Sequence, residues 1–135
     1  MSSSAARLSF CGARLSSSDA DCRANCDPHQ LARDVLDQVR HELRLSWGMG
    51  FEFVDIPSWG EYDPKRPTLL RLSTKLLRPH FVDYIPYVVA HEAMHAWRRL
   101  RALDGSLMAS TILDADANEQ AANDYGHAFA KRWRC

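Results

Sequence analysis

The sequence predicts a single α+β domain in which a small β-sheet packs beside helices. Three segments, residues 28–47, 84–103 and 115–133, have the patterns of helices, and two short segments between the first and the second, 51–56 and 68–74, have the composition of strands. The chain has 135 residues and 46% hydrophobic content. That length is enough for one hydrophobic core but not for two.

The first helix is marked by its start. Asp27 is a residue type that caps helices, Pro28 suits the first helical position, and Gln30 lies three residues after the cap. An apolar stripe with helical spacing follows, and the pattern ends near Trp47, before Gly48. The stripe consists of Leu31, Val35, Leu36, Val39 and Leu43.

Two strands and a loop follow this helix. Residues 51–56 alternate in the manner of a strand, and residues 68–74 form the second predicted strand. Residues 57–67 between them contain several prolines and a glycine, which predicts a loop. The loop contains Trp59 and Tyr62, which are candidates to line a cleft.

The helix predicted at residues 84–103 carries an H-E-x-x-H motif, and Asp83 is its candidate cap. Residues four apart lie on the same face of a helix, so His91 and His95 can present two imidazole nitrogens to one metal ion. Glu92 lies beside them. Two neutral ligands with a carboxylate that accepts a proton are what a zinc hydrolase needs.

The last predicted helix begins behind the cap candidates Asp114 and Asp116 and offers a third ligand. A catalytic zinc usually takes three protein ligands. The two candidates are Glu119 and His127, which form one stripe with Asn123 because the three are spaced four apart. Small residues on this helix would let it approach the motif helix closely. They are Ala117, Ala121, Ala122 and Ala128.

H-E-x-x-H followed by a helix bearing N-E-x-x-x-N, which ends at Asn123, resembles the zincin metallopeptidases of the gluzincin branch. The resemblance covers residues 68–133, half of the chain. It implies a minimal zincin-like fold with one zinc ion held by His91, His95 and Glu119. In that family an Asp supports a zinc-binding His, and here the corresponding residue is Asn123. A neutral amide still accepts a hydrogen bond but lacks the charge of a carboxylate.

The resemblance also implies an activity, the hydrolysis of peptide bonds in a peptide or protein substrate. Glu92 would be the general base that takes a proton from a water molecule activated by zinc. The family receives an extended substrate along a sheet edge beside the metal helix, and residues 68–74 are the candidate edge. Tyr125 or His127 would then lie near the substrate and stabilise a developing oxyanion.

A second branch, the SprT-like metalloproteases, is also similar. These proteins pair a strand like residues 70–77 with an H-E-x-x-H-A helix like residues 89–97, and their third ligand is a His. That role would fall to His127, although Gly126 precedes it and Phe129 follows by only two, which breaks the family's order. The alternative function is therefore a DNA-associated metalloprotease. A non-catalytic zinc-binding regulatory module and a metal-free helical domain are further alternatives.

Charge and composition restrict the partners. The chain has seventeen basic and seventeen acidic residues and a net charge of zero, so no overall attraction to nucleic acid or to an anionic membrane is expected. A nucleic-acid partner would rest chiefly on the SprT-like resemblance. No apolar stretch approaches the roughly eighteen residues of a membrane span. The sequence does not indicate an oligomeric state.

Residues 1–26 are predicted to be a disordered tail, and residues 27–135 to be the zincin-like domain. Residues 1–18 are rich in Ser and Ala, include two Arg and no acidic residue, and lack the apolar region of a secretory signal. An organellar transit peptide is the alternative to a plain tail.

The four cysteines, at positions 11, 22, 26 and 135, do not have the number or spacing of a disulfide framework. They are expected to be reduced thiols in an intracellular, cytoplasmic protein. The alternative is a second zinc site formed by Cys11, Cys22, Cys26 and His29.

Overall fold

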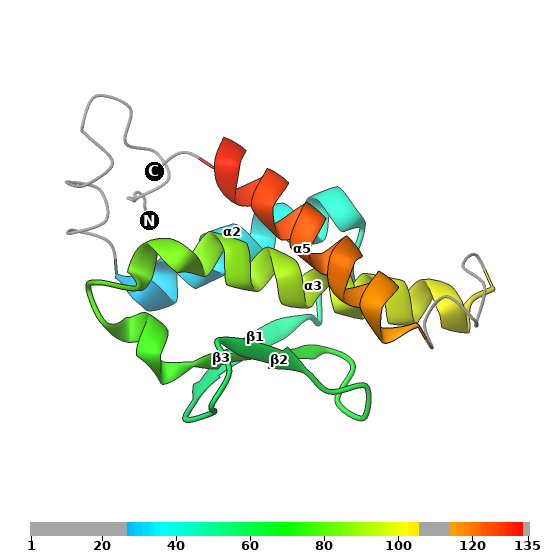
Figure 1. Ribbon diagram of the computed structural model, residues 1–135, viewed down its shortest axis with the longest axis horizontal. Helices are drawn as coiled ribbons and strands as arrows, with labels where there is room; N and C mark the ends of the chain where they lie inside the picture. The colour runs from blue at the N-terminus through cyan, green and yellow to red at the C-terminus, as the bar shows by residue number, and fades with distance from the viewer. Residues whose placement is uncertain (1–26, 106–113, 134–135) are drawn as a thin grey trace.

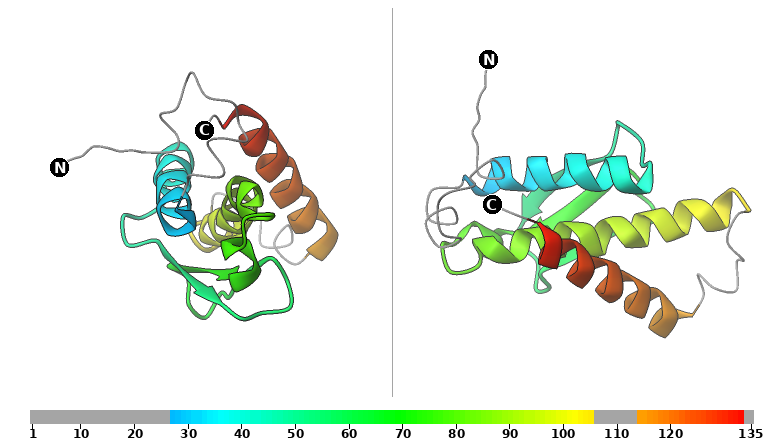
Figure 2. Two further views of the ribbon diagram at one scale, coloured as in Figure 1. Left: turned by 90° about the vertical axis from the view of Figure 1, so that its left-hand side faces the viewer. Right: turned by 90° about the horizontal axis from the view of Figure 1, so that it is seen from above.

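The computed structural model describes residues 27–105 and 114–133, and the described residues form an α+β domain as predicted (Figure 1). Helix α3 lies at the centre, with a three-stranded sheet on one side of it and helices α2 and α5 on its other sides (Figure 2). The elements are α2 (Pro28–Leu43), β1 (Gly50–Val54), β2 (Gly60–Tyr62), β3 (Leu69–Ser73), the 3-10 turns η2 (Thr74–Leu77) and η3 (Val82–Tyr84), α3 (Ile85–Leu103) and α5 (Ala115–Arg132).

The predictions for the tail and for the four cysteines fall on residues outside the described ranges. Within the described ranges, no helix combines the length and the hydrophobicity that crossing a bilayer requires.

Helix α2 begins as predicted but ends earlier. The side chain of Asp27 accepts a hydrogen bond from the N–H of Gln30 at 3.2 Å, and Pro28 occupies the first turn. The predicted end near Trp47 is wrong, because Arg44 adopts a left-handed conformation with φ of 55° and closes the helix there. No glycine marks this position, so the sequence pattern placed the end one turn too late.

Helix α3 begins without the predicted cap. Asp83 lies inside the 3-10 turn η3, which runs directly into α3. Tyr84 is the residue that precedes the helix, and its side chain makes no capping hydrogen bond. Pro86 in the first turn has no N–H to satisfy, which reduces the need for a cap.

The sheet has the strand order β1-β3-β2, with β1 parallel and β2 antiparallel to β3. The prediction that residues 68–74 form a sheet edge is therefore wrong, because β3 has a hydrogen-bonded neighbour on each side. The loop predicted at residues 57–67 contains a strand, β2, of only three residues. So short a strand shows no alternating pattern and exists because it pairs with the distant β3.

The core lies where α2, α3 and the sheet meet. Val35, Val39, Leu70, Leu72 and Val89 are fully buried there. Phe129 of α5 is also buried and holds the last helix against α3. Because α3 is packed on several sides, polar groups on it are costly unless they are satisfied. His91 and Glu92 are nevertheless buried on this helix.

Glu42 ties the end of α5 to α2. The Tyr125 hydroxyl donates a hydrogen bond to Glu42 Oε1 at 2.7 Å, and the guanidinium of Arg132 donates to both carboxylate oxygens. The hydrogen bond from Arg132 is the main cause that lowers the pKa of Glu42 from 4.5 to about 2, while burial opposes the shift. The contact fixes α5, which carries Glu119, relative to α2.

This contact predicts a pH-dependent stability difference. Because the pKa of Glu42 is lower in the folded chain than its ordinary value of 4.5, the ionised carboxylate stabilises the fold above that pH, and the contribution is lost as pH falls toward 2. We expect Glu42→Gln to lower the free energy of unfolding at neutral pH by about 1 kcal/mol, the scale of a partly exposed ionic hydrogen bond. In urea titrations the difference from wild type should shrink as pH falls. A difference that is the same at every pH would contradict this role of Glu42.

Candidate metal centre

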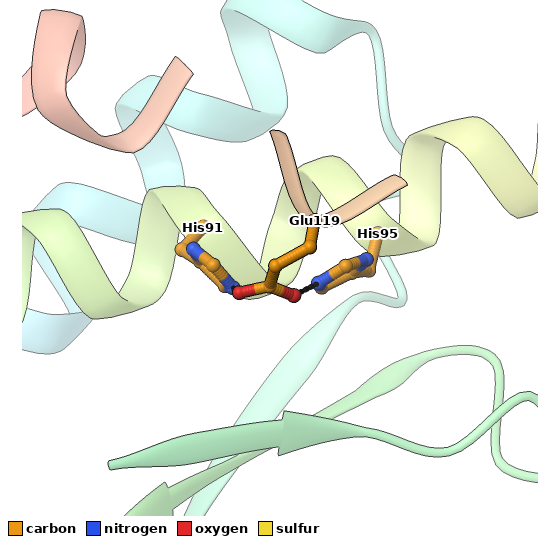
Figure 3. A group of neighbouring side chains, drawn as sticks. All are labelled: His91, His95 and Glu119. Atoms are coloured by element: carbon orange, nitrogen blue, oxygen red, sulfur yellow. Dashed lines mark ion pairs between the residues drawn. The ribbon is translucent and has the colours of Figure 1, made fainter. Parts of the chain in front are cut away.

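Helices α3 and α5 bring together three side chains that could act as metal ligands (Figure 3). His91 and His95 project from one face of α3, and Glu119 reaches them from α5. Nε2 of His91 lies 3.1 Å from Glu119 Oε2, and Nε2 of His95 lies 3.2 Å from Glu119 Oε1. One ligand atom from each residue lies within 4.8 Å of the others, so the group can hold a metal ion.

These distances fit a small tetrahedral cation. Zinc binds imidazole nitrogen and carboxylate oxygen at about 2.1 Å, so two neighbouring ligand atoms in a tetrahedron lie about 3.4 Å apart. The two nitrogen–oxygen separations are close to this value. The donor set of two imidazoles and one carboxylate is also a set that zinc uses. The Glu119 side chain is 56% exposed, so solvent reaches one side of the group.

The electrostatics of the group favour a cation between its members. A neutral imidazole nitrogen with a free lone pair and a carboxylate oxygen repel each other at 3.1 Å, unless a proton or a cation lies between them. Burial, the largest influence, lowers the pKa of His91. The charge of Glu119 acts in the opposite direction, and His95 adds to the lowering.

Glu92 lies beside the three ligand candidates. Its Oε2 is 3.8 Å from Nε2 of His91, and its side chain is 9% exposed. Burial, followed by the charges of Glu119 and Glu61, raises the pKa of Glu92 from 4.5 to about 8. A bound divalent cation would act in the opposite direction and favour the carboxylate form. The carboxyl group of Glu92 thus lies where it can exchange a proton beside the candidate metal ligands.

A cleft of about 510 Å³ opens in front of these side chains. The edge strand β2 forms one wall, and α3 and α5 form the other. Gly60 permits this arrangement, because a Cβ there would lie 2.8 Å from Val88 Cγ1 and 3.1 Å from Glu92 Cγ. The residues that line the cleft besides the ligand candidates and Glu92 include Ser58, Glu61, Tyr62, Arg99 and Asn118.

The two aromatic residues predicted to line a cleft have different places. Tyr62 lies in the cleft wall, as expected. Trp59 instead packs edge-on against Phe81 and Tyr84, with ring centroids 5.1 and 5.4 Å apart, and the ammonium of Lys75 lies over its ring. Trp59 is therefore a packing residue of the loop.

Neither Tyr125 nor His127 lines the cleft. Tyr125 donates its hydroxyl hydrogen to Glu42 on α2. His127 packs against the ring of Tyr87 at a tilt, with centroids 4.6 Å apart, and is not a member of the group of candidate metal ligands. The crossing of α5 over α3 brings the start of the α5 stripe to His91 and His95, and the expected role of Tyr125 or His127 in stabilising an oxyanion stays a prediction.

Asn123 supports His91 differently from the expectation. The Tyr87 hydroxyl donates a hydrogen bond to Asn123 Oδ1 at 2.7 Å and lies 3.1 Å from Nδ1 of His91. The Asn123 amide also raises the pKa of His91, although burial outweighs this influence. Tyr87 therefore joins the amide to the imidazole, whereas the sequence predicted Asn123 alone.

Sequence reasoning missed Tyr87, Gly60 and Gly126. Tyr87 lies one turn before His91 on the same helix face, and this spacing was the available signal. Gly126 is needed for the contact between the helices, since a Cβ there would lie 2.8 Å from Cε1 of Tyr87 and 3.2 Å from its carbonyl oxygen. The importance of both glycines depends on elements that are far apart in the sequence.

Comparison with known proteins gives no relative: no family model matches the chain, no curated protein is similar to it, and no solved structure matches its fold. The interpretation of the site therefore depends on its geometry and chemistry.

Proposed function

We propose that the protein is a zinc-dependent peptidase with a minimal zincin-like fold. The observation that carries the proposal is the meeting of His91, His95 and Glu119 at zinc-ligand distances, with the buried carboxyl group of Glu92 beside them. Two imidazoles, a third ligand from another helix and an adjacent carboxylate make up a hydrolytic zinc site.

His91, His95 and Glu119 would hold the ion. When bound, zinc supplies Lewis acidity, which makes a water molecule acidic enough to attack at neutral pH and polarises the scissile carbonyl. The carboxylate of Glu92 accepts the proton of the attacking water and returns it to the leaving amine nitrogen. Burial of Glu92 keeps bulk water from competing for this proton.

The edge strand β2 is the proposed docking site for the substrate backbone. Its pairing with β3 uses one side of the strand, and its other side faces the cleft. An extended peptide can add to such an edge through main-chain hydrogen bonds. This would place a carbonyl group of the peptide beside the candidate metal ligands. Gly60 lets this edge approach Glu92 closely.

A positively charged side chain, Arg99, also lines the cleft. Arg99 follows His95 by one helical turn on the same face, and its charge acts on Tyr62 in the opposite wall. Substrates with an acidic group near the scissile bond would pair with this guanidinium. The SprT-like alternative requires His127 as a ligand, and the packing of His127 against the ring of Tyr87 does not support it.

A digest of a random peptide library tests the proposal. We expect the full chain loaded with zinc to cleave peptides, with an excess of acidic residues at one position near the cleaved bond, and a chelator to abolish cleavage. Zinc binding without any cleavage would instead indicate the non-catalytic binding module. A chain that binds no zinc would remove the basis of the proposal.

A further inference from the structure

We propose that Tyr87 is a positioning residue that sets the tautomer of His91. In this arrangement the Tyr87 hydroxyl donates its proton to Asn123 and accepts the Nδ1–H of His91. The lone pair of His91 Nε2 is then directed at Glu119. The proposed zinc site depends on this orientation, but the tautomer itself exists whether or not a metal binds.

The two hydrogen bonds that link His91 through Tyr87 to Asn123 form a relay. Its direction follows from the number of protons on the Tyr87 hydroxyl. A phenol has one proton and therefore makes one donated hydrogen bond. The shorter contact of the Tyr87 oxygen, 2.7 Å, is to Asn123 Oδ1, which only accepts. The contact to His91 Nδ1 at 3.1 Å must then use the hydroxyl oxygen as acceptor, and the hydrogen must lie on Nδ1. The neutral ring consequently has no hydrogen on Nε2.

The phenol keeps its proton under ordinary conditions. Burial chiefly raises the pKa of Tyr87 above 10, and the charges of Glu119 and Glu92 raise it further. Near neutral pH a phenol carries its proton in any case, so the hydroxyl can donate to Asn123.

Packing holds the Tyr87 ring in this position. The ring lies over the backbone of α5 at Gly126, where even one added methyl group would lie 2.8 Å from Cε1. His127 packs against the same ring at a tilt, with centroids 4.6 Å apart. These contacts restrict the ring from the α5 side. Tyr87 is thus enclosed between His91 on α3 and the segment of α5 from Asn123 to His127.

The relay explains how a neutral amide serves at position 123. Asn123 carries no charge with which to orient an imidazole, but its Oδ1 is sufficient to take the proton of a phenol. Tyr87 thereby converts a weak acceptor on α5 into a defined proton arrangement on His91. Partners of this kind on a metal-binding histidine change metal affinity by roughly 10- to 100-fold when they are removed.

Nitrogen NMR of the ¹⁵N-labelled, metal-free full chain tests the tautomer directly. Long-range correlations distinguish a protonated Nδ1 from a protonated Nε2 in a neutral imidazole. We expect His91 of the wild type to carry its hydrogen on Nδ1. Tyr87→Phe should shift His91 toward the Nε2–H form. The matched control, Tyr84→Phe, removes a hydroxyl one turn earlier that makes no hydrogen bond to His91, and should leave the tautomer unchanged.

Two variants of Asn123 test the direction of the relay. Asn123→Ala removes the acceptor, so the Tyr87 hydroxyl is free to donate to His91 and the Nε2–H form should increase. Asn123→Asp keeps an acceptor and should retain the Nδ1–H form. A merely structural role for Asn123 would not make these two substitutions differ in the tautomer of His91.

Zinc affinity, measured by competition with a chromophoric chelator, is the second readout. We expect Tyr87→Phe to weaken zinc binding by about 10- to 100-fold relative to Tyr84→Phe. A wild-type His91 with its hydrogen on Nε2, or a tautomer unchanged in both Tyr87→Phe and Asn123→Ala, would overturn the inference. If no variant binds zinc, the proposed function fails while the tautomer measurement still decides the role of Tyr87.

Discussion

Glu92→Gln is expected to abolish peptide hydrolysis while zinc binding persists. The amide has the same shape as the carboxyl group and fits the same buried position beside His91. It cannot accept the proton of the attacking water, and loss of a general base costs on the order of 10²- to 10⁴-fold in rate. The measurement is the cleavage rate of a defined peptide, with zinc content determined on the same sample.

Glu52→Gln is the matched control for this variant. Glu52 lies on β1, near Arg66 and Arg71 and away from the cleft, so the same chemical change should leave cleavage unaltered. Undiminished cleavage by a zinc-loaded Glu92→Gln protein would show that Glu92 is not the base. Loss of zinc from that variant would show that Glu92 belongs to the ligands.

Glu119→Ala and His127→Ala are expected to differ sharply in zinc affinity. Glu119 lies 3.1 and 3.2 Å from the two histidine nitrogens, so its removal takes away one of the three proposed ligands. The loss should exceed the 100-fold scale of residues that only support a ligand. His127 packs against Tyr87 outside the group of candidate ligands, so its truncation should change zinc affinity far less.

The two substitutions are well matched for stability. Glu119 is 56% exposed in its side chain, and His127 is also exposed, so neither truncation opens a cavity in the core. Thermal unfolding of both metal-free variants should be close to that of the wild type. A larger loss of zinc affinity in His127→Ala than in Glu119→Ala would favour the SprT-like ligand set instead.

The helices and the ligand candidates could be predicted from local sequence. Apolar spacing, the Asp27 cap and the four-residue spacing of His91 and His95 depend only on residues within one helix. The stripe on α5 limited the third ligand to Glu119 or His127. The resemblance to the gluzincins, and not the spacing, selected Glu119 from the two. These signals are encoded within a turn or two of each residue.

The remaining features depend on how distant elements meet. A stripe along α5 does not reveal which of its members lies at the crossing with α3. The crossing brings Glu119 to His91 and His95, and Asn123 to Tyr87, so that His127 lies one turn too far along. The edge strand β2 likewise exists only through its pairing with β3, and its three residues carry no pattern of their own.

In the proposed site, His91, His95 and Glu119 bind one zinc ion together. Anomalous diffraction at the zinc edge, from crystals of the zinc-loaded full chain, tests it most directly. We expect one strong peak per chain, bonded to Nε2 of His91, Nε2 of His95 and the carboxylate of Glu119. A peak held by other residues, or no peak between α3 and α5 at saturating zinc, would contradict it.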